Sequence, residues 1–441
     1  MQEISACSSL RPSRTWRRGL GLFGALVFFG SPLWASSQYS APGILEPTEE
    51  IPEQEDLEES YEAARWPVGS LRFAPWLGVR NAGLVRGNPE SALQEEDDFT
   101  ITIGAGLRAY ARTGKVFYAL HMLPEYVWWE ENEEKRQTNG RFGVGAFGYF
   151  NRVRWEASLR RTEEQGFFSS EVQELTTERR DEARLVAEVK VGSRLWVHGR
   201  ARFQEFRNEE EEQTRLRQID RDEDSVRLGV RYRTPRGYFV GLGFEDLSTS
   251  FAEGLFDRSN SGEAGRFELG FEGNRLQYQL ELADKSLDPD MGSGFRGFDD
   301  LTGELELLAQ LSRRLVFLTW ARRDIYYSIR AENSHFLSER FGARLELTGR
   351  RVRLGVFAEF GEDDYEAISG GGPDRLDDMT AYGASFAIDF GRTTGLVVDL
   401  LRTEYDSTLD TFDRDVTTLS ARLEFGSLLR KLSIGNPPGA W

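Results

Sequence analysis

Apolar and polar residues alternate along most of the chain with a period of two. From Val153 to Arg160 and from Val226 to Arg233, apolar residues take every second position, and mostly charged residues take the positions between them. Because successive side chains of a strand point to opposite faces, this pattern predicts β-strands with one apolar and one polar face. A helix would need apolar residues three and four positions apart, and these segments lack that spacing.

The segments are separated by short turns and by long polar stretches, which follow one another alternately along the chain. The short turns join neighbouring segments in the manner of β-hairpins. They lie at Thr113-Gly114, Asn151-Arg152, Gly192-Ser193, 235–237, Gly273-Asn274, Ser312-Arg313, Thr348-Gly349 and Gly391-Arg392. The long stretches, expected to be loops, cover 81–97, 164–181, 207–222, 286–300 and 362–377. Short periplasmic turns and long extracellular loops are typical of transmembrane β-barrels.

The predicted fold class is therefore all-β: a single transmembrane antiparallel β-barrel of about 18 strands, with about 16 strands as the alternative. An even number of strands places both ends of the barrel in the periplasm. A soluble β-sandwich would not need strands this long, and a soluble propeller would show a blade-length repeat, which is not seen. The expected strand centres are Phe73, Ile103, Leu120, Ala146, Ala157, Val189, Ala201, Val230, Leu242, Leu269, Leu280, Leu307, Phe317, Leu345, Val356, Phe386, Val398 and Leu423.

The apolar face of these strands is expected to meet lipid. Aromatic residues gather at the segment ends, for example Trp128 and Tyr326 on the loop side and Tyr232 and Tyr238 on the turn side. Amphipathic rings favour the headgroup zone of a membrane, and a closed barrel leaves no unpaired strand edge in hydrocarbon. Rim packing in a soluble barrel is the alternative for these rings. We expect the protein in the cell outer membrane of a Gram-negative bacterium.

The first 35 residues have the layout of a cleavable signal peptide. Basic residues precede an apolar run from Leu20 to Phe29, and small residues lead to Ala35. That order is typical of secretory signals, and the apolar run is short for a membrane-spanning helix. The only cysteine, Cys7, would leave with the signal. The mature chain would then have no thiol for a disulfide or a metal site.

Three further parts follow residues 1–35. Residues 36–69 are acidic and rich in Glu and Pro, which predicts a disordered periplasmic segment or a marginal helix. Residues 70–426 form the predicted outer-membrane β-barrel, and residues 427–441 form a C-terminal tail. The closing strand would run from Leu419 to Phe425, so the signal that the barrel-assembly machinery reads during insertion would lie inside the chain.

The net charge of −18 and the mean hydropathy of −0.50 narrow the function. The negative charge argues against nucleic acid as a partner, because phosphates would repel the chain. A low mean hydropathy fits a barrel, in which only every other residue faces lipid. Acidic stretches such as 95–98 and 362–364 favour the hypothesis that loops bind divalent cations bridging lipopolysaccharide phosphates. Solvated loops kept soluble by their charge are the alternative.

The polar face of the strands would line the barrel interior. Buried charges without partners are costly, so this lining implies water, mutual ion pairing or both. A barrel of about 16 to 18 strands is wide enough for an aqueous channel. The interpretation is a polar passage, and the alternative is a salt-bridge lattice that stiffens the wall and conducts little. The expected pore-lining residues are Arg154, Arg160, Arg200, Arg202, Arg227, Arg231, Glu268, Arg344, Glu346, Arg353 and Glu359.

Candidate catalytic and metal-binding residues are few. The chain has three histidines, His121, His198 and His335, and none stands at a recognisable spacing from a nucleophile and an orienting group. The stretch 288–294 has Asp and Gly residues suited to calcium but lacks the twelve-residue ligand pattern. We expect no enzyme activity, no cofactor and no metal site. A hydrolase that depends on His198 or His335 is the least favoured alternative.

The opening of the predicted barrel resembles a known family. Ser70 to Pro75 starts the first strand, an acidic loop ends at 96–99, a hairpin follows at 112–114, and then comes Pro124-Glu125-Tyr126. This layout is similar to the β-barrel porin 2 family of outer-membrane proteins, and the resemblance covers residues 70–426. It implies a porin-like barrel linked with exopolysaccharide export.

We therefore expect a monomeric porin-like channel or export conduit for polar solutes, with a link to exopolysaccharide export. The alternative is a non-conducting scaffold in a surface-polysaccharide assembly complex, docked through the acidic segment 36–66. The expected partners are the outer membrane with its lipopolysaccharide, the barrel-assembly machinery during insertion and periplasmic export components.

Overall fold

The computed structural model describes residues 54–91, 94–133, 136–166, 176–208, 220–251, 257–328, 333–368, 375–390, 394–409 and 413–426. The predicted signal peptide, residues 36–53 of the acidic segment, the predicted turn at Gly391-Arg392 and the tail 427–441 lie outside the described residues.

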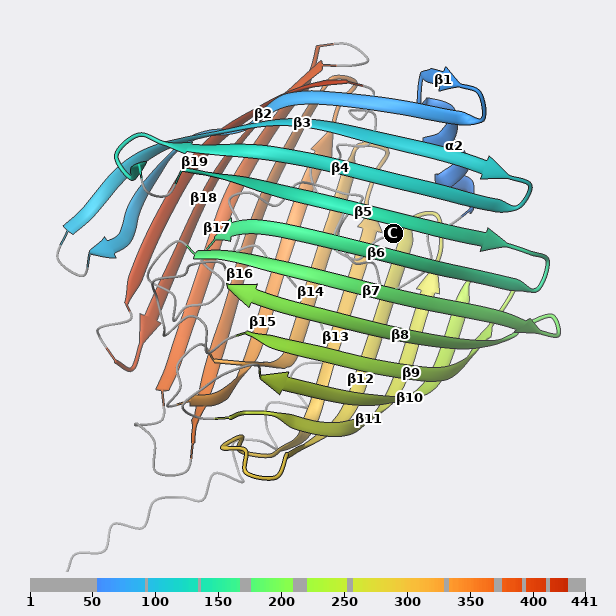
Figure 1. Ribbon diagram of the computed structural model, residues 1–441. Helices are drawn as coiled ribbons and strands as arrows, with labels where there is room; N and C mark the ends of the chain where they lie inside the picture. Colours follow the sequence, from blue (N-terminus) through green and yellow to red (C-terminus); the bar gives the residue numbers. More distant parts are fainter. Residues whose placement is uncertain are drawn as a thin grey trace, which may run out of the picture.

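The described chain forms one closed antiparallel β-barrel (Figure 1). Each strand from β2 onward pairs with the next one in sequence, and β19 pairs with β2 to close the ring of 18 strands. No pair of neighbouring strands needs a crossover, because short turns or loops join them in sequence order. The strands are β2 (Leu71–Ser91), β3 (Gln94–Thr113), β4 (Val116–Trp129), β5 (Gln137–Tyr149), β6 (Val153–Gly166), β7 (Thr176–Val191), β8 (Leu195–Asn208), β9 (Arg221–Arg233), β10 (Tyr238–Phe251), β11 (Asn260–Glu272), β12 (Leu276–Pro289), β13 (Phe298–Gln310), β14 (Leu315–Tyr326), β15 (Asn333–Thr348), β16 (Val352–Ala367), β17 (Arg375–Asp389), β18 (Thr394–Ser407) and β19 (Arg414–Gly426).

The predicted fold class is confirmed, and the strand number is 18 rather than the alternative of 16. Every expected strand centre falls inside a different strand. The predicted short turns that fall within the described residues also lie where they were predicted, as in the hairpin between β3 and β4. There Gly114 has a φ of 63°, in the left-handed region that favours glycine.

The strands are longer than the alternation alone predicted. Most of the expected loop 81–97 belongs to β2 and β3, and the start of the expected loop 362–377 belongs to β16. The acidic residues 362–364 therefore lie on a strand and not in a loop. The reason is that the backbone ladder continues above the membrane, where both faces of a strand meet water and the apolar–polar alternation ends.

The outer face of the barrel is apolar at mid-height. Leu159 on β6, Leu185 on β7 and Leu228 on β9 are 57%, 55% and 63% exposed. A soluble protein would not leave such a continuous apolar band in water. The band is the surface expected to contact lipid acyl chains, since outward positions of membrane barrels are apolar.

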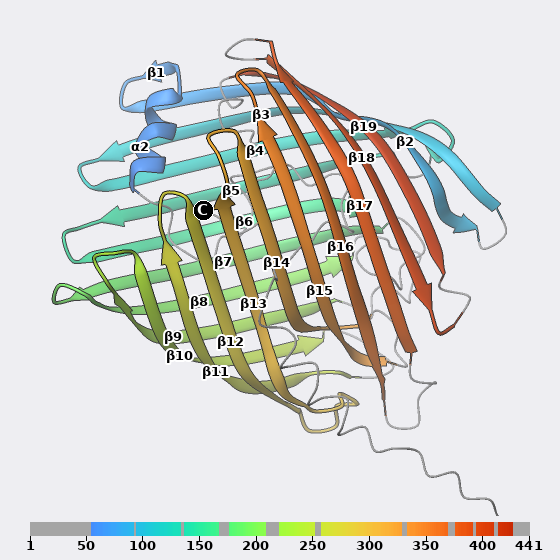
Figure 2. The ribbon, with the colours of Figure 1, turned by 180° about the vertical axis from the view of Figure 1, so that it is seen from behind.

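A short helix lies at the end of the barrel where the hairpin turns are. Helix α2 (Gln54–Ala63) precedes β1 (Trp66–Val68), which pairs with the start of β2 (Figure 2). The acidic segment was predicted to be disordered or marginally helical, and the structure has a helix in this part of it. Leu57, Tyr61 and Ala64 recur every three to four residues, so they share one apolar side of the helix. Among the described residues, no helix is long and apolar enough to cross a membrane.

Helix α2 packs on an apolar part of the inner wall. Leu57 and Ala64 are buried, and Tyr61 packs against the same cluster. The cluster's wall residues, all with inward positions on β2, β3, β4, β5 and β7, are Ala74, Tyr110, Phe117, Ala119, Phe147, Tyr149 and Val186. Polar contacts hold the helix as well: Arg112 forms an ion pair with Glu58 at 3.0 Å, and the Arg72 guanidinium lies 4.4 Å from the Tyr61 ring. The helix therefore occupies part of the periplasmic mouth.

Candidate functional site

Charged side chains cover much of the inner wall. In each strand, positions that alternate with the lipid-facing leucines and valines point inward. On β9, for example, Leu228 and Val230 are exposed outside while Arg227 and Arg231 are buried inside. The period of two thus carries a row of arginines and glutamates into the interior of the barrel.

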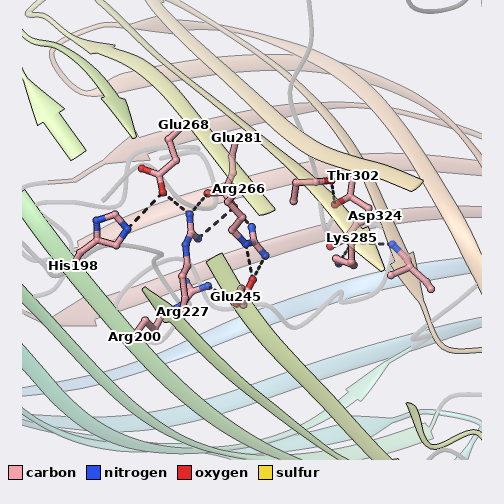
Figure 3. Close-up of polar contacts among 12 residues, drawn as sticks. His198, Arg200, Arg227, Glu245, Arg266, Glu268, Glu281, Lys285, Thr302 and Asp324 are labelled. Atoms are coloured by element: carbon pink, nitrogen blue, oxygen red, sulfur yellow. Dashed lines mark hydrogen bonds and ion pairs between the residues drawn. The ribbon is translucent and has the colours of Figure 1, made fainter. Parts of the chain in front are cut away.

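Glu268 on β11 is the centre of one ion-pair network (Figure 3). Arg231 Nε on β9 donates to Glu268 Oε2 at 2.9 Å, and Arg231 Nη2 lies 2.7 Å from the same oxygen. Arg227 donates to the other carboxylate oxygen of Glu268. His198 Nε2 on β8 lies 4.0 Å from that same oxygen. Because Glu268 is 3% exposed, its charge depends on these cationic partners rather than on bulk water.

The same network extends across β8 to β12. Arg266 on β11 contacts both Glu245 on β10 and Glu281 on β12. Arg200 on β8 donates to Glu245 at 3.5 Å, and Arg227 Nη2 donates to Glu281 at 3.1 Å. Figure 3 shows the arginines and glutamates facing one another along this stretch of wall. We call these residues, with Glu268 and Arg231, the Glu268 network.

A second group of paired charges lies on β6, β7 and β8. Glu182 is within 3.6 Å of both Arg160 and Arg202, and Gln204 donates to it at 2.9 Å. Glu156, which is fully buried, lies 3.6 Å from Arg160 and 3.8 Å from Arg184.

Further pairs line the strands on the other side. Lys285 contacts Asp324 at 2.6 Å, and Arg340 contacts Asp363 at 2.6 Å. Arg353 lies 3.2 Å from Asp389, near the turn end of β16 and β17. Each of these pairs joins neighbouring strands or strands two apart, so the paired charges belong to one side of the barrel.

The charges of the two sides are of opposite sign. Among the described side chains, the inner faces of β6 to β9 carry 11 basic and 5 acidic residues, and we call this side the basic wall. Its basic residues are Arg154, Arg160, Arg180, Arg184, Lys190, Arg200, Arg202, Arg221, Arg227, Arg231 and Arg233. Its acidic residues are Glu156, Glu178, Glu182, Glu188 and Glu223.

The opposite side, formed by β13 to β18, is acidic. On its described inner faces, 9 acidic residues stand against the 5 basic residues Arg322, Arg340, Arg344, Arg353 and Arg375. The acidic residues of this acidic wall are Glu304, Glu306, Asp324, Glu346, Glu359, Asp363, Asp377, Asp389 and Asp399. Figure 1 shows the green strands of the basic wall in front and the orange strands of the acidic wall behind.

The eleven residues expected to line a pore all have inward positions. Arg154, Arg160, Arg200, Arg202, Arg227 and Arg231 lie on the basic wall, and Arg344, Glu346, Arg353 and Glu359 lie on the acidic wall. The structure brings Arg200, Arg227, Arg231 and Glu268 together in the Glu268 network. The other members lie apart from it: Arg344 is 3.9 Å from Glu346, and the Arg154 guanidinium lies 5.3 Å from the Trp196 ring.

Several members of the charged wall were not among the expected residues. Glu182 and Arg184 belong to β7, which begins at Thr176, inside the stretch expected to be a loop. The signal was present, since Glu182, Arg184, Val186 and Glu188 alternate with Ala183, Leu185 and Ala187. Extending the alternation back from Val189 by three more positions on each face would have found them.

The three histidines lie far apart in the barrel wall. The His121 ring meets the Tyr110 ring edge-on at 6.0 Å, and His198 joins the Glu268 network. His335 Nδ1 lies 3.1 Å from Ser334 Oγ, while its ring packs against Phe295 and Phe298. Ser334 Oγ in turn accepts a hydrogen bond from the Arg296 backbone. Within the described ranges, no group of three or more His, Cys, Asp or Glu residues is arranged to hold a metal ion.

The stretch 288–294 is part of an ordered extracellular loop. The Ser293 and Gly294 backbone amides donate to the carbonyl groups of Asp290 and Asp257, and the Ser261 hydroxyl donates to the Asp290 carboxylate at 2.9 Å. Phe295, just beyond it, packs with Leu287 and Phe298. These contacts tie the loop between β12 and β13 to the start of β11.

No family model and no curated protein matches the sequence. Solved structures do match: Pseudomonas aeruginosa OccK9 (OpdG) has a TM-score of 0.50 at 10% identity, covering 80% of this chain and 98% of that one. The outer membrane protein OpdK of Pseudomonas aeruginosa has a TM-score of 0.49 at 11% identity, covering 80% and 98% of the two chains. OccAB3 of Acinetobacter baumannii has a TM-score of 0.46 at 12% identity, covering 80% and 99%. At such identities a likeness shows the fold alone: this chain has the fold of an outer-membrane β-barrel, with 18 antiparallel strands.

Proposed function

We propose that the protein is an outer-membrane channel for polar solutes. The observation that carries the proposal is the charged inner wall, with the Glu268 network on one side and the Arg340–Asp363 pair on the other. An interior without solutes or water would not need so many ionisable groups, because apolar packing is the less costly way to fill a barrel.

The pattern of ion pairing supports a passage. The pairs described above connect strands no more than three apart, as between Arg227 on β9 and Glu281 on β12. Such pairs neutralise charge along each wall. Their own side chains do not cross the space between the two walls. A barrel of about 16 to 18 strands is wide enough to leave an aqueous channel.

Single-channel conductance of the refolded chain lacking residues 1–35 in a planar bilayer tests this proposal. We expect discrete, reproducible conductance steps from a protein that migrates as a heat-modifiable barrel. A folded, heat-modifiable barrel that never conducts would contradict the channel and favour the non-conducting scaffold. A protein without heat modifiability has not folded, so folding is checked first on every sample.

The narrower form of the proposal is export of exopolysaccharide, which is supported by the resemblance of the opening strands to the β-barrel porin 2 family. An export conduit should bind its polymer in the lumen, so anionic polysaccharide added on the turn side should interrupt the current in a concentration-dependent way. A neutral polymer of equal length is the matched control. Equal effects of the two polymers, or none from either, would remove the polysaccharide from the proposal and leave the channel.

A further inference from the structure

The two charged walls face each other across the lumen. The barrel has 18 strands, and the basic wall (β6 to β9) is centred about half a turn of the ring from the acidic wall (β13 to β18). Figures 1 and 2 show the two sets of strands as the near and far sides of the barrel in opposite views. The described side chains thus give the basic wall an excess of six positive charges and the acidic wall an excess of four negative charges.

One side of the barrel between the walls, β10 to β12, has inward Glu245, Glu268, Glu272 and Glu281 against Arg266 and Lys285. The other side between the walls, β2 to β5, has inward Arg72, Arg108, Arg112 and Arg141 against Asp98 and Glu125. Its inward positions include Trp76, Leu123 and Phe147, and its turn end is covered by α2. Strands β2 to β5 thus add net positive charge beside the basic wall, and β10 to β12 add net negative charge beside the acidic wall. The main electric field in the lumen therefore runs from the basic side to the acidic side, across the direction of transport. Low-dielectric walls around water concentrate such a field inside the lumen.

We infer that the channel favours solutes that carry a positive and a negative group at opposite ends. This inference rests on the proposed channel function and specifies its substrate class. A dipolar solute gains energy by turning its anionic end to the basic wall and its cationic end to the acidic wall. A solute with one charge gains at one wall and loses at the other, and a neutral solute gains nothing from the field.

Four peptides of closely similar size provide the test. Triglycine carries both charges at neutral pH, N-acetyldiglycinamide carries none, N-acetyldiglycine carries a negative charge and triglycinamide a positive one. Their entry into proteoliposomes is measured by osmotic swelling at low salt. We expect triglycine to enter roughly threefold faster than the neutral peptide, with each singly charged peptide slower than triglycine.

Salt provides a test that needs no variant. At an ionic strength of about 1 M the Debye length falls to about 3 Å, well below the width of the lumen, so the preference for triglycine should disappear. The entry of the neutral peptide should stay unchanged, because it does not respond to the field. A triglycine preference that survives high salt would have another origin and would overturn the inference.

Variants then locate the effect. Arg202→Gln on the basic wall and Asp399→Asn on the acidic wall remove charges from side chains that are 25% and 38% exposed, so both proteins should fold. Each should reduce the triglycine preference, and the double variant should reduce it further. The matched control is Arg161→Gln, because Arg161 lies next to Arg160 in sequence but points outward, where it binds Asp181. It should leave the preference intact.

The outcomes separate the two proposals. Conductance together with equal entry of triglycine and the neutral peptide would contradict the preference for dipolar solutes, while the channel function would stand. Fastest entry of a singly charged peptide would likewise contradict that preference and indicate an ion-selective pore. A folded barrel that admits none of the peptides and does not conduct would end the channel proposal itself.

Discussion

At the scale of single residues, a buried charge is stable only where partners of opposite charge compensate for its lost hydration. Glu268 is 3% exposed and accepts from both Arg227 and Arg231, so it neutralises two guanidinium groups at once. Glu272 lies on the same strand and the same face, but its side chain is 49% exposed, and its carboxylate lies 3.3 Å from Arg233. The two glutamates therefore differ in burial far more than in chemistry.

Replacing Glu268 with Ala should destabilise the barrel strongly. Breaking a buried ion pair by removing one partner typically costs about 3–5 kcal/mol, because the other charge stays buried. The measurement is the free energy of unfolding by urea in lipid vesicles. Glu272→Ala is the matched control and should cost about 0–1 kcal/mol, as exposed pairs do. Equal losses from the two variants would mean that water, rather than Glu268, solvates the arginines.

At the scale of elements, helix α2 is held by one apolar side and by two arginines. Leu57 is buried in the cluster of aromatic wall residues, while Glu59 on the same helix is exposed. A charged side chain at position 57 would be costly to bury in the apolar cluster. It would move into water, and α2 would then detach from the inner wall.

Leu57→Asp should therefore release α2 from the inner wall. We expect faster cleavage by trypsin at Arg65, larger single-channel conductance and an unchanged heat-modifiable barrel. Glu59→Gln, which changes a side chain that faces away from the cluster, should behave as the original protein does. Conductance that stays the same although Arg65 becomes cleavable would show that the helix does not narrow the passage.

The elements also show how far a pattern of residues can predict a structure. The 18 strands followed from alternation because lipid outside and charge inside impose opposite chemistry on successive residues, as in Val226 to Arg233. The inner face of β4 does not follow this rule: Phe117, Ala119 and Leu123 point inward although they are apolar. Phe117 and Ala119 are apolar because α2 covers them. No local pattern in the sequence of β4 predicts that a helix packs there.

The partners of the charges could not be predicted in the same way. Glu268 is paired with residues 37 and 41 positions before it in sequence. Which of the inward arginines it meets depends on the register between β9, β10 and β11, and on the glycines there. Gly241 on β10 lies between Arg231 on β9 and Glu268 on β11, and it has no side chain to separate them. Alternation identifies the face of a residue but not its height relative to the neighbouring strand.

At the scale of the whole molecule, stability in the membrane depends on the outer apolar band. Leu228 is 63% exposed at the middle of β9, whereas Asp224 lies on the same strand and the same face but nearer the loops. A charge at the middle of the bilayer costs more than a charge near the interface.

Leu228→Arg should lower the free energy of unfolding from vesicles by about 2–4 kcal/mol, the range for arginine at the bilayer midplane. Asp224→Arg, nearer the loop end, should cost about 0–1 kcal/mol. The same pair of variants in detergent micelles, which adapt their shape, should differ less. Equal stability of the two variants in vesicles would mean that Leu228 does not lie closer to the bilayer midplane than Asp224.

The place of α2 also determines an order of events during biogenesis. The helix is synthesised before any strand of the barrel, yet the wall that receives it is assembled from β2, β3, β4, β5 and β7, which emerge after it. The apolar side of α2 therefore has no surface to pack on until a large part of the barrel has formed. Leu57 and Tyr61 therefore stay unburied until the strands up to β7 have assembled, so α2 docks late although it precedes those strands in sequence.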